Sequence, residues 1–167
     1  DLTNQTFKLV MFDIANGYIT KYHNMINEVR KKRKDLILAA GNVVTKEGVK
    51  AISEAGTDLV KIGIGSGSVC DTSTVTGIGY PQFSAVDECS NEAVNLGVKI
   101  IADGGIRSSG DIVKSFVAGA DFVMLGSLLA GHEQGGSPLK EINGKKHRQY
   151  YGMSSGQAMS IHEGKKK

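Results

Sequence analysis

Most of this chain is divided by five short apolar runs. Each run leads to a turn and then to an amphipathic stretch. The apolar runs cover residues 7–14, 36–40, 59–64, 98–102 and 122–125. Apolar spacing and capping residues predict helices over about 20–32, 47–55, 82–95 and 111–118. Repeated strand–helix units of this kind favour a parallel sheet with helical crossovers. Because the runs are almost continuously apolar, the faces of this sheet are expected to be covered.

Two architectures have this pattern: a doubly wound sheet of five strands, and part of a (β/α)8 barrel. A doubly wound sheet gathers its site at one switch point, whereas a barrel builds its site from many strand ends. Here four of the predicted strands end in glycine and polar residues. The prediction is therefore the α/β class with a (β/α)8 TIM barrel that is incomplete in this chain, lacking about three strand–helix units.

The pattern changes after residue 125. Residues 139–151 are polar and contain Asn143-Gly144, a preferred pair for a two-residue hairpin turn. We expect a flap hairpin here, over the mouth of the barrel. Residues 1–167 are interpreted as the central and C-terminal part of one barrel catalytic domain.

Composition argues against several classes of protein. No apolar run reaches the length of a membrane span. The net charge of +3 comes largely from the basic runs at 31–34 and 165–167, which are more typical of solvated ends than of a nucleic-acid site. The two cysteines form neither a disulfide framework nor a metal-ligand spacing. A reducing, cytoplasmic location is expected, with no membrane and no nucleic acid as partner.

The stretch from 61 to 86 reads K-I-G-I-G-S-G-S-V-C-D-T-S-T-V-T-G-I-G-Y-P-Q-F-S-A-V. It places one cysteine among glycines and hydroxyl residues, directly after a strand. Glycine lets a ligand approach the backbone, and a thiol with a lowered pKa is a nucleophile. Cys70 is therefore the candidate nucleophile for a polar ligand. Cys89 lies in a predicted helix among apolar residues and is expected to pack in the core.

This stretch resembles the active-site loop of the IMP dehydrogenase and GMP reductase family. Four further segments are similar to that family: D-I-A-N-G at 13–17, A-G-N-V at 40–43, D-G-G-I at 103–106, and F-V-M-L-G with L-A-G at 122–131. The resemblance extends to about residue 161. Y-P-Q-F-S-A-V at 80–86 and Y-Y-G-M-S-S at 150–155 are more similar to the reductase branch than to the dehydrogenase branch, which has V-P-Q-I-T-A-V and Y-R-G-M-G-S.

The reductase branch implies NADPH-dependent reductive deamination of GMP to IMP and ammonia through a covalent cysteine thioimidate. By resemblance, Cys70 is the nucleophile, because thiolate addition at C2 of the purine makes a centre that can expel ammonia. Thr72 matches the threonine that moves a proton to the departing ammonia together with a glutamate. Glu163 is either that glutamate, rejoining the family pattern after an omitted flap segment, or an unrelated residue of an exposed tail.

The resemblance also implies ligand positions. The acidic Asp103 would hold the ribose hydroxyls. Family members are homotetramers, which predicts a homotetramer that binds GMP or IMP. The implied substrate-binding positions are Ser68, Asp103, Gly104, Gly105, Gly126, Ser127, Gly152, Met153 and Ser154; the cofactor-binding positions are Asp13, Ile14, Ala15, Ile64 and Gly65; and the potassium positions, which would use carbonyl oxygens, are Gly65, Gly67, Cys70 and Ser73.

Some residues depart from the family pattern. Ser66 stands in place of a usual proline, Asp71 in place of a threonine and Ser73 in place of an arginine, and residues 106–107 differ from the reductase D-G-G-C. Two alternatives stay open. One is an IMP dehydrogenase, which would pass hydride to NAD and release its intermediate with water. The other is a non-catalytic relative that binds purine nucleotides.

Overall fold

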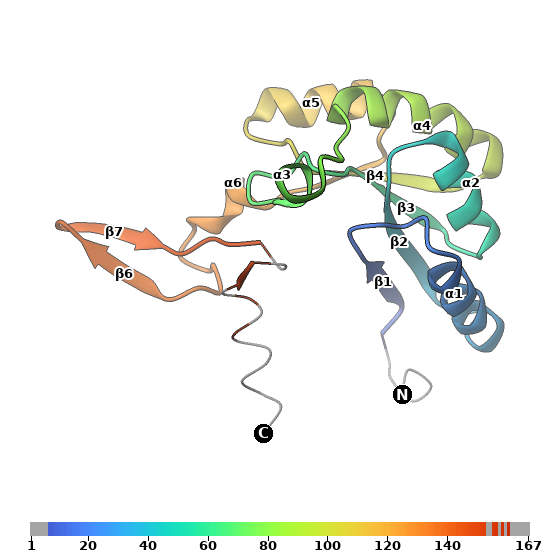
Figure 1. The fold of residues 1–167 in the computed structure, drawn as a ribbon, viewed down its shortest axis with the longest axis horizontal. Helices are drawn as coiled ribbons and strands as arrows, with labels where there is room; N and C mark the ends of the chain where they lie inside the picture. The colour runs from blue at the N-terminus through green and yellow to red at the C-terminus, as the bar shows by residue number, and fades with distance from the viewer. Residues whose placement is uncertain (1–6, 153–154, 157, 159, 161–167) are drawn as a thin grey trace.

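The computed structural model describes residues 7–152, 155, 156, 158 and 160, and Figure 1 shows its fold. One parallel sheet contains five strands in the order in which they follow along the chain. A doubly wound sheet would reverse that order at a switch point, so this alternative is wrong. The strands are β1 (Leu9–Asp13), β2 (Ile37–Val43), β3 (Leu59–Ile62), β4 (Lys99–Asp103) and β5 (Phe122–Met124).

The helices between these strands lie along one side of a curled sheet (Figure 1). A curled parallel sheet with its helices outside is part of a barrel, so the predicted α/β class and the incomplete (β/α)8 barrel are confirmed. No helix in the described part of the chain is long and apolar enough to cross a membrane. The long helices are α1 (Thr20–Lys32), α2 (Lys46–Glu54), α4 (Gln82–Leu96) and α5 (Ser109–Val117), and the short ones are α3 (Thr72–Thr76) and α6 (Ser127–Ala130).

Local capping chemistry sets several of these helix ends. The Thr45 hydroxyl accepts a hydrogen bond from the Gly48 amide at the start of α2, and Ser108 accepts one from Asp111 at the start of α5. Gly97 ends α4 with φ of 71°, a left-handed conformation that suits glycine. The sequence pattern predicts the ends at Thr45 and Gly97 and leaves Ser108 and Ser109 as alternatives for α5, of which Ser108 is the cap.

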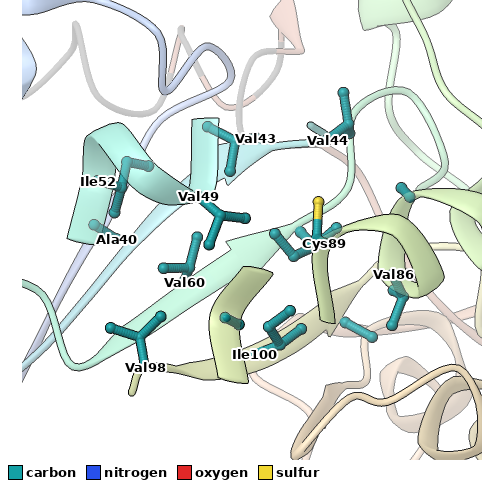
Figure 2. Close-up of a cluster of buried hydrophobic side chains, with 14 of the residues drawn as sticks. Ala40, Val43, Val44, Val49, Ile52, Val60, Val86, Cys89, Val98 and Ile100 are labelled. Carbon is teal, nitrogen blue, oxygen red and sulfur yellow. The ribbon is translucent and has the colours of Figure 1, made fainter. Parts of the chain in front are cut away.

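The hydrophobic core lies between the sheet and the helices that cover it (Figure 2). Side chains from α2 and α4 meet those that point outward from β2, β3 and β4, which leaves the opposite face of the sheet to line the barrel interior. Cys89 is fully buried there, as the sequence predicts. The fully buried members include Ile26, Leu38, Val43, Val49, Ile52, Val60, Ile62, Val86, Cys89 and Ile100.

The end of β2 differs from the sequence-based expectation. The pattern predicts that the strand ends at residue 40, because Gly41-Asn42 looks like a turn. Instead β2 continues to Val43. A Cβ on Gly41 would lie 2.6 Å from the Cβ of Lys61 on β3, so a glycine is needed for the two strands to approach. Here glycine serves close packing between strands rather than a turn.

Residues 139–148 form an antiparallel hairpin, with strands β6 (Leu139–Ile142) and β7 (Lys145–Arg148). Asn143 and Gly144 connect them with φ of 52° and 71°, as a type I′ turn requires. In Figure 1 the hairpin projects away from the sheet. Its role as a flap over the barrel mouth stays a prediction.

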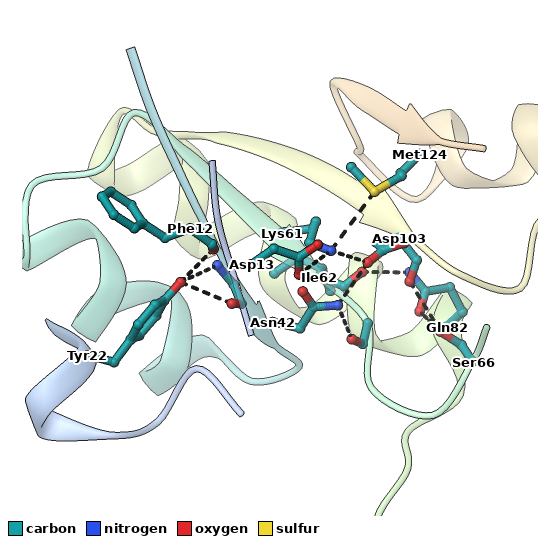
Figure 3. Close-up of polar contacts among 12 residues, drawn as sticks. Phe12, Asp13, Tyr22, Asn42, Lys61, Ile62, Ser66, Gln82, Asp103 and Met124 are labelled. Atoms are coloured by element: carbon teal, nitrogen blue, oxygen red, sulfur yellow. Dashed lines mark hydrogen bonds and ion pairs between the residues drawn. The ribbon is translucent and has the colours of Figure 1, made fainter. Parts of the chain in front are cut away.

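The phenol of Tyr22, on α1, bridges β1 and β2 through two hydrogen bonds. It lies where the strands would otherwise share a direct backbone hydrogen bond. Its oxygen accepts from the Gly41 amide at 3.0 Å and donates to the Phe12 carbonyl at 2.7 Å (Figure 3). Burial raises the pKa of Tyr22 to about 12, so the hydroxyl keeps its proton near neutral pH.

Replacing Tyr22 with phenylalanine should therefore lower the free energy of unfolding by about 1–3 kcal/mol, because the buried Gly41 amide loses its acceptor. Denaturation by urea measures the change. Tyr80→Phe is the matched control, since the Tyr80 hydroxyl bonds to Glu88 at the surface and its loss should matter little. Equal stability changes in the two variants would argue against the role assigned to Tyr22.

Candidate active site

A cavity of about 770 Å³ lies at the carboxyl ends of the strands. Residues at or just beyond the ends of all five strands contribute to its wall: Asp13 from β1, Asn42 from β2, Gly63 after β3, Asp103 from β4 and Met124 from β5. This is the end of the barrel at which (β/α)8 enzymes place their active sites.

Most of the residues that sequence reasoning selected meet around this cavity. Ile64 does not line it, because it is buried with the hydrophobic core. Ser73 lies on α3, outside the lining. Met153, Ser154 and Glu163 lie outside the described residues. The predicted residues that line the cavity are Asp13, Ile14, Ala15, Gly65, Gly67, Ser68, Cys70, Thr72, Asp103, Gly104, Gly105, Gly126, Ser127 and Gly152.

The thiol of Cys70 reaches the cavity from the loop between β3 and α3. It donates a hydrogen bond to the Thr72 hydroxyl at 3.3 Å, and the Cys70 amide donates to the Gly67 carbonyl at 3.2 Å. The nucleophile and the proton carrier expected from the sequence are thus in direct contact. Such contact is the arrangement that a proton transfer between them requires.

Ser66, which replaces the usual proline of this loop, is held by side-chain hydrogen bonds. Its hydroxyl donates to Oε1 of Gln82 at 2.8 Å, and Nε2 of Gln82 donates to the Ile62 carbonyl at 2.8 Å (Figure 3). Gln82 therefore connects the loop to the end of β3. This contact fixes the loop where the ring of a proline is absent.

The two cysteines differ sharply in environment. Cys70 borders the cavity, whereas Cys89 is 0% exposed and burial raises the pKa of its thiol to about 12. Because the thiolate is the reactive form, Cys89 should be inert near pH 8.

Iodoacetamide at pH 8 is accordingly expected to label Cys70 in the folded protein and to leave Cys89 unmodified. Mass spectrometry of the digested protein measures both sites. In urea both cysteines should react, because unfolding removes the burial of Cys89. Labelling of Cys89 in the folded protein at the rate of Cys70 would contradict this assignment.

A charged cluster, formed by Lys61, Asp13, Asp103 and Asn42, crosses the floor of the cavity (Figure 3). The ammonium of Lys61 lies 2.8 Å from Oδ1 of Asp13 and 2.6 Å from Oδ2 of Asp103. Sequence reasoning selected both aspartates but missed Lys61 and Asn42. The available signal was a lysine inside an apolar run, since a buried lysine is rare unless it is paired.

The loop brings the predicted potassium positions together in two pairs. A Cβ on Gly65 would lie 3.1 Å from the Cβ of Ser73, and one on Gly67 would lie 3.2 Å from the Cβ of Cys70. Backbone carbonyls are hard oxygen donors of the kind that suit an alkali cation. Potassium at these four positions stays a prediction.

The sequence as a whole matches a family of known proteins. The model of the IMP dehydrogenase / GMP reductase domain matches residues 1–167. The chain belongs to the IMP dehydrogenase / GMP reductase family. The resemblance seen in the sequence is thereby confirmed.

Several curated members of the family are similar to most of the chain. It is 48% identical to a GMP reductase of Enterobacter sp. (strain 638) over 163 residues. Those residues make up 98% of this chain and 47% of that protein. It is 50% identical over 157 residues to GMP reductase 2 of Bos taurus, with 94% and 45% covered. The chain thus spans about half the length of the curated relatives it matches.

Proposed function

We propose that this chain belongs to an enzyme that reductively deaminates GMP to IMP and ammonia with NADPH, through a covalent thioimidate on Cys70. The observation that carries the proposal is the position of the Cys70–Thr72 pair on the same cavity as Asp103 and the glycines after β4 and β5. The similarity to curated GMP reductases supports it.

The cavity offers a complementary wall for a purine nucleotide. Asp103 would accept hydrogen bonds from the two ribose hydroxyls. Backbone N–H groups near Gly105 and Gly126 would face the phosphate, a common arrangement at the last strands of a barrel. The purine would then lie against the loop that carries Cys70. The residues Asp103, Gly105, Gly126 and Cys70 all line the cavity.

Cys70 and Thr72 would carry out the covalent steps. The sulfur forms a bond to C2 of the purine, the bond from C2 to the amine breaks, and the amine leaves with a proton. The Thr72 hydroxyl, which accepts a hydrogen bond from the Cys70 thiol, would pass a proton to the amine. Bound NADPH supplies the hydride for C2. Cleavage of the bond between sulfur and carbon then returns the thiolate and releases IMP.

The dinucleotide side of the cavity would use Asp13, Ile14, Ala15 and Gly65, which line it. NADPH rather than NADH is part of the proposal. We further propose potassium on the carbonyls of residues 65, 67, 70 and 73, and a cytoplasmic homotetramer as the assembled enzyme. Sedimentation at micromolar concentration tests the assembly, and a monomer there would reject it.

The decisive experiment follows NADPH absorbance in the full-length protein, with and without GMP, and measures ammonia in parallel. GMP-dependent loss of NADPH with an equal amount of ammonia would support the proposed reaction. Reduction of NAD by IMP without any reaction of GMP would favour the dehydrogenase branch. If both reactions are absent while GMP still binds, the chain is a nucleotide-binding relative.

A further inference from the structure

The strongest unassigned feature of the molecule is the ammonium of Lys61. Lys61 lies inside β3 and is only 3% exposed. Its nitrogen contacts Asp13, Asp103 and, at 3.9 Å, the sulfur of Met124. A buried ammonium is costly unless it is paired, so the two carboxylates and the lysine depend on one another.

The register of the sheet explains how one lysine reaches two aspartates. Asp13 on β1 pairs with Gly41 on β2, and Gly41 pairs with Lys61 on β3, so the three residues form one row. Gly41 has no side chain, and a Cβ there would lie 2.6 Å from the Cβ of Lys61. The lysine side chain therefore extends across the middle strand to reach Asp13.

The cluster leaves part of each carboxylate available to the cavity. Oδ2 of Asp103 accepts from Lys61 and, at 3.0 Å, from Nδ2 of Asn42. Within the described residues no partner reaches Oδ1 of Asp103 or Oδ2 of Asp13. Oδ1 of Asn42 is buried without a partner in the same region. Both aspartates are thus held by one oxygen while their other oxygen is free to accept from a ligand.

We propose that Lys61 is a positioning residue that orients Asp103 on the nucleotide side and Asp13 on the dinucleotide side of the cavity. One ammonium thereby sets the affinity for both ligands. This inference rests on the proposed function, because that function assigns the two aspartates to different ligands. Without Lys61 the two carboxylates would repel each other across a short distance, and neither would keep its orientation.

The test compares ligand binding by the full-length chain and by Lys61→Met, which replaces the ammonium with an unbranched apolar group. Calorimetry gives the affinity for GMP and for 2′,3′-dideoxy-GMP, which lacks both ribose hydroxyls, and fluorescence gives the affinity for NADPH. In Lys61→Met we expect the affinities for GMP and NADPH to fall roughly tenfold or more. The affinity for the dideoxy analogue should stay unchanged, since it makes no bond to Asp103. Lys61→Arg, which keeps the positive charge, should restore most of the loss.

Lys99→Met is the matched control. It removes an exposed ion pair with Asp121, in which the two charged groups are 2.9 Å apart. The pair lies at the start of β4 and away from the cavity, so all three affinities should be retained. Asp13→Asn is a second probe that does not depend on tolerance of a change at Lys61. It leaves the contact between Lys61 and Asp103 in place. The affinity for NADPH should therefore fall, while the affinity for GMP should stay unchanged.

Three outcomes would overturn the proposal. They are unchanged affinities in Lys61→Met, an equal loss for GMP and the dideoxy analogue, and a loss of GMP affinity in Asp13→Asn that matches the loss for NADPH. A failure of the proposed reaction looks different. There, the unmutated chain would bind GMP without oxidising NADPH, and the effect of Lys61 would still be read from the binding data.

Discussion

Replacement of Cys70 with alanine is expected to lower GMP-dependent oxidation of NADPH on the order of a thousandfold or more. The reason is that no other group in the described part of the cavity is a comparable nucleophile; the second cysteine lies in the hydrophobic core. Binding of GMP should be retained, because the contacts proposed for Asp103 and for the glycines after β4 and β5 do not involve the sulfur. Steady-state absorbance and calorimetry measure the two effects separately.

Cys89→Ala provides the matched control, since it removes the same sulfur atom from a buried position on α4. The free energy of unfolding should fall by about 1–2 kcal/mol through the small cavity that forms, and the rate per folded molecule should stay the same. A Cys70→Ala variant that kept a tenth of the activity would reject Cys70 as the nucleophile, while a loss of GMP binding would place its main role in recognition.

Much of the fold follows from local signals in the sequence. The apolar period of residues 20–32 predicts α1 with its observed bounds, and Asn143-Gly144 predicts the observed hairpin turn. The structural role of a glycine was harder to predict, because it depends on the neighbouring strands and helices. Gly97 ends a helix, whereas Gly41 lies within a strand beneath a neighbouring side chain. The short helices α3 and α6 have too few residues for a period to be detected.

Candidate site residues could be predicted where one short segment of the sequence contains all the residue types that the site needs. The loop around Cys70 and the glycines after Asp103 belong to this kind, and they line the cavity. Lys61 was not predictable, because its partners Asp13 and Asp103 lie far away in the sequence. Only the register across three strands, with a glycine in the middle one, brings them together. A single lysine in an apolar run indicates a partner but does not identify it.

Gly63→Ala is expected to lower the free energy of unfolding by about 3 kcal/mol or more, a large fraction of the stability of an ordinary domain. Gly63 follows β3 with φ of 146°, which side chains rarely adopt. A Cβ there would overlap the backbone carbonyl of Asp103 and lie 2.7 Å from Oε1 of Gln82. Because the main chain of Asp103 would have to shift, the affinity for GMP should fall as well. Urea denaturation and calorimetry measure the two changes.

Gly97→Ala separates the two causes of this loss. Gly97 also has a left-handed conformation, with φ of 71°, but a Cβ there meets nothing within 4 Å. Only the backbone strain then remains, so a loss of about 1 kcal/mol is expected, with GMP binding unchanged. If Gly63→Ala were no more costly than Gly97→Ala, the ends of β3 and β4 would tolerate a side chain between them. The close approach that holds Asp103 against the Cys70 loop would then have no part in shaping the site.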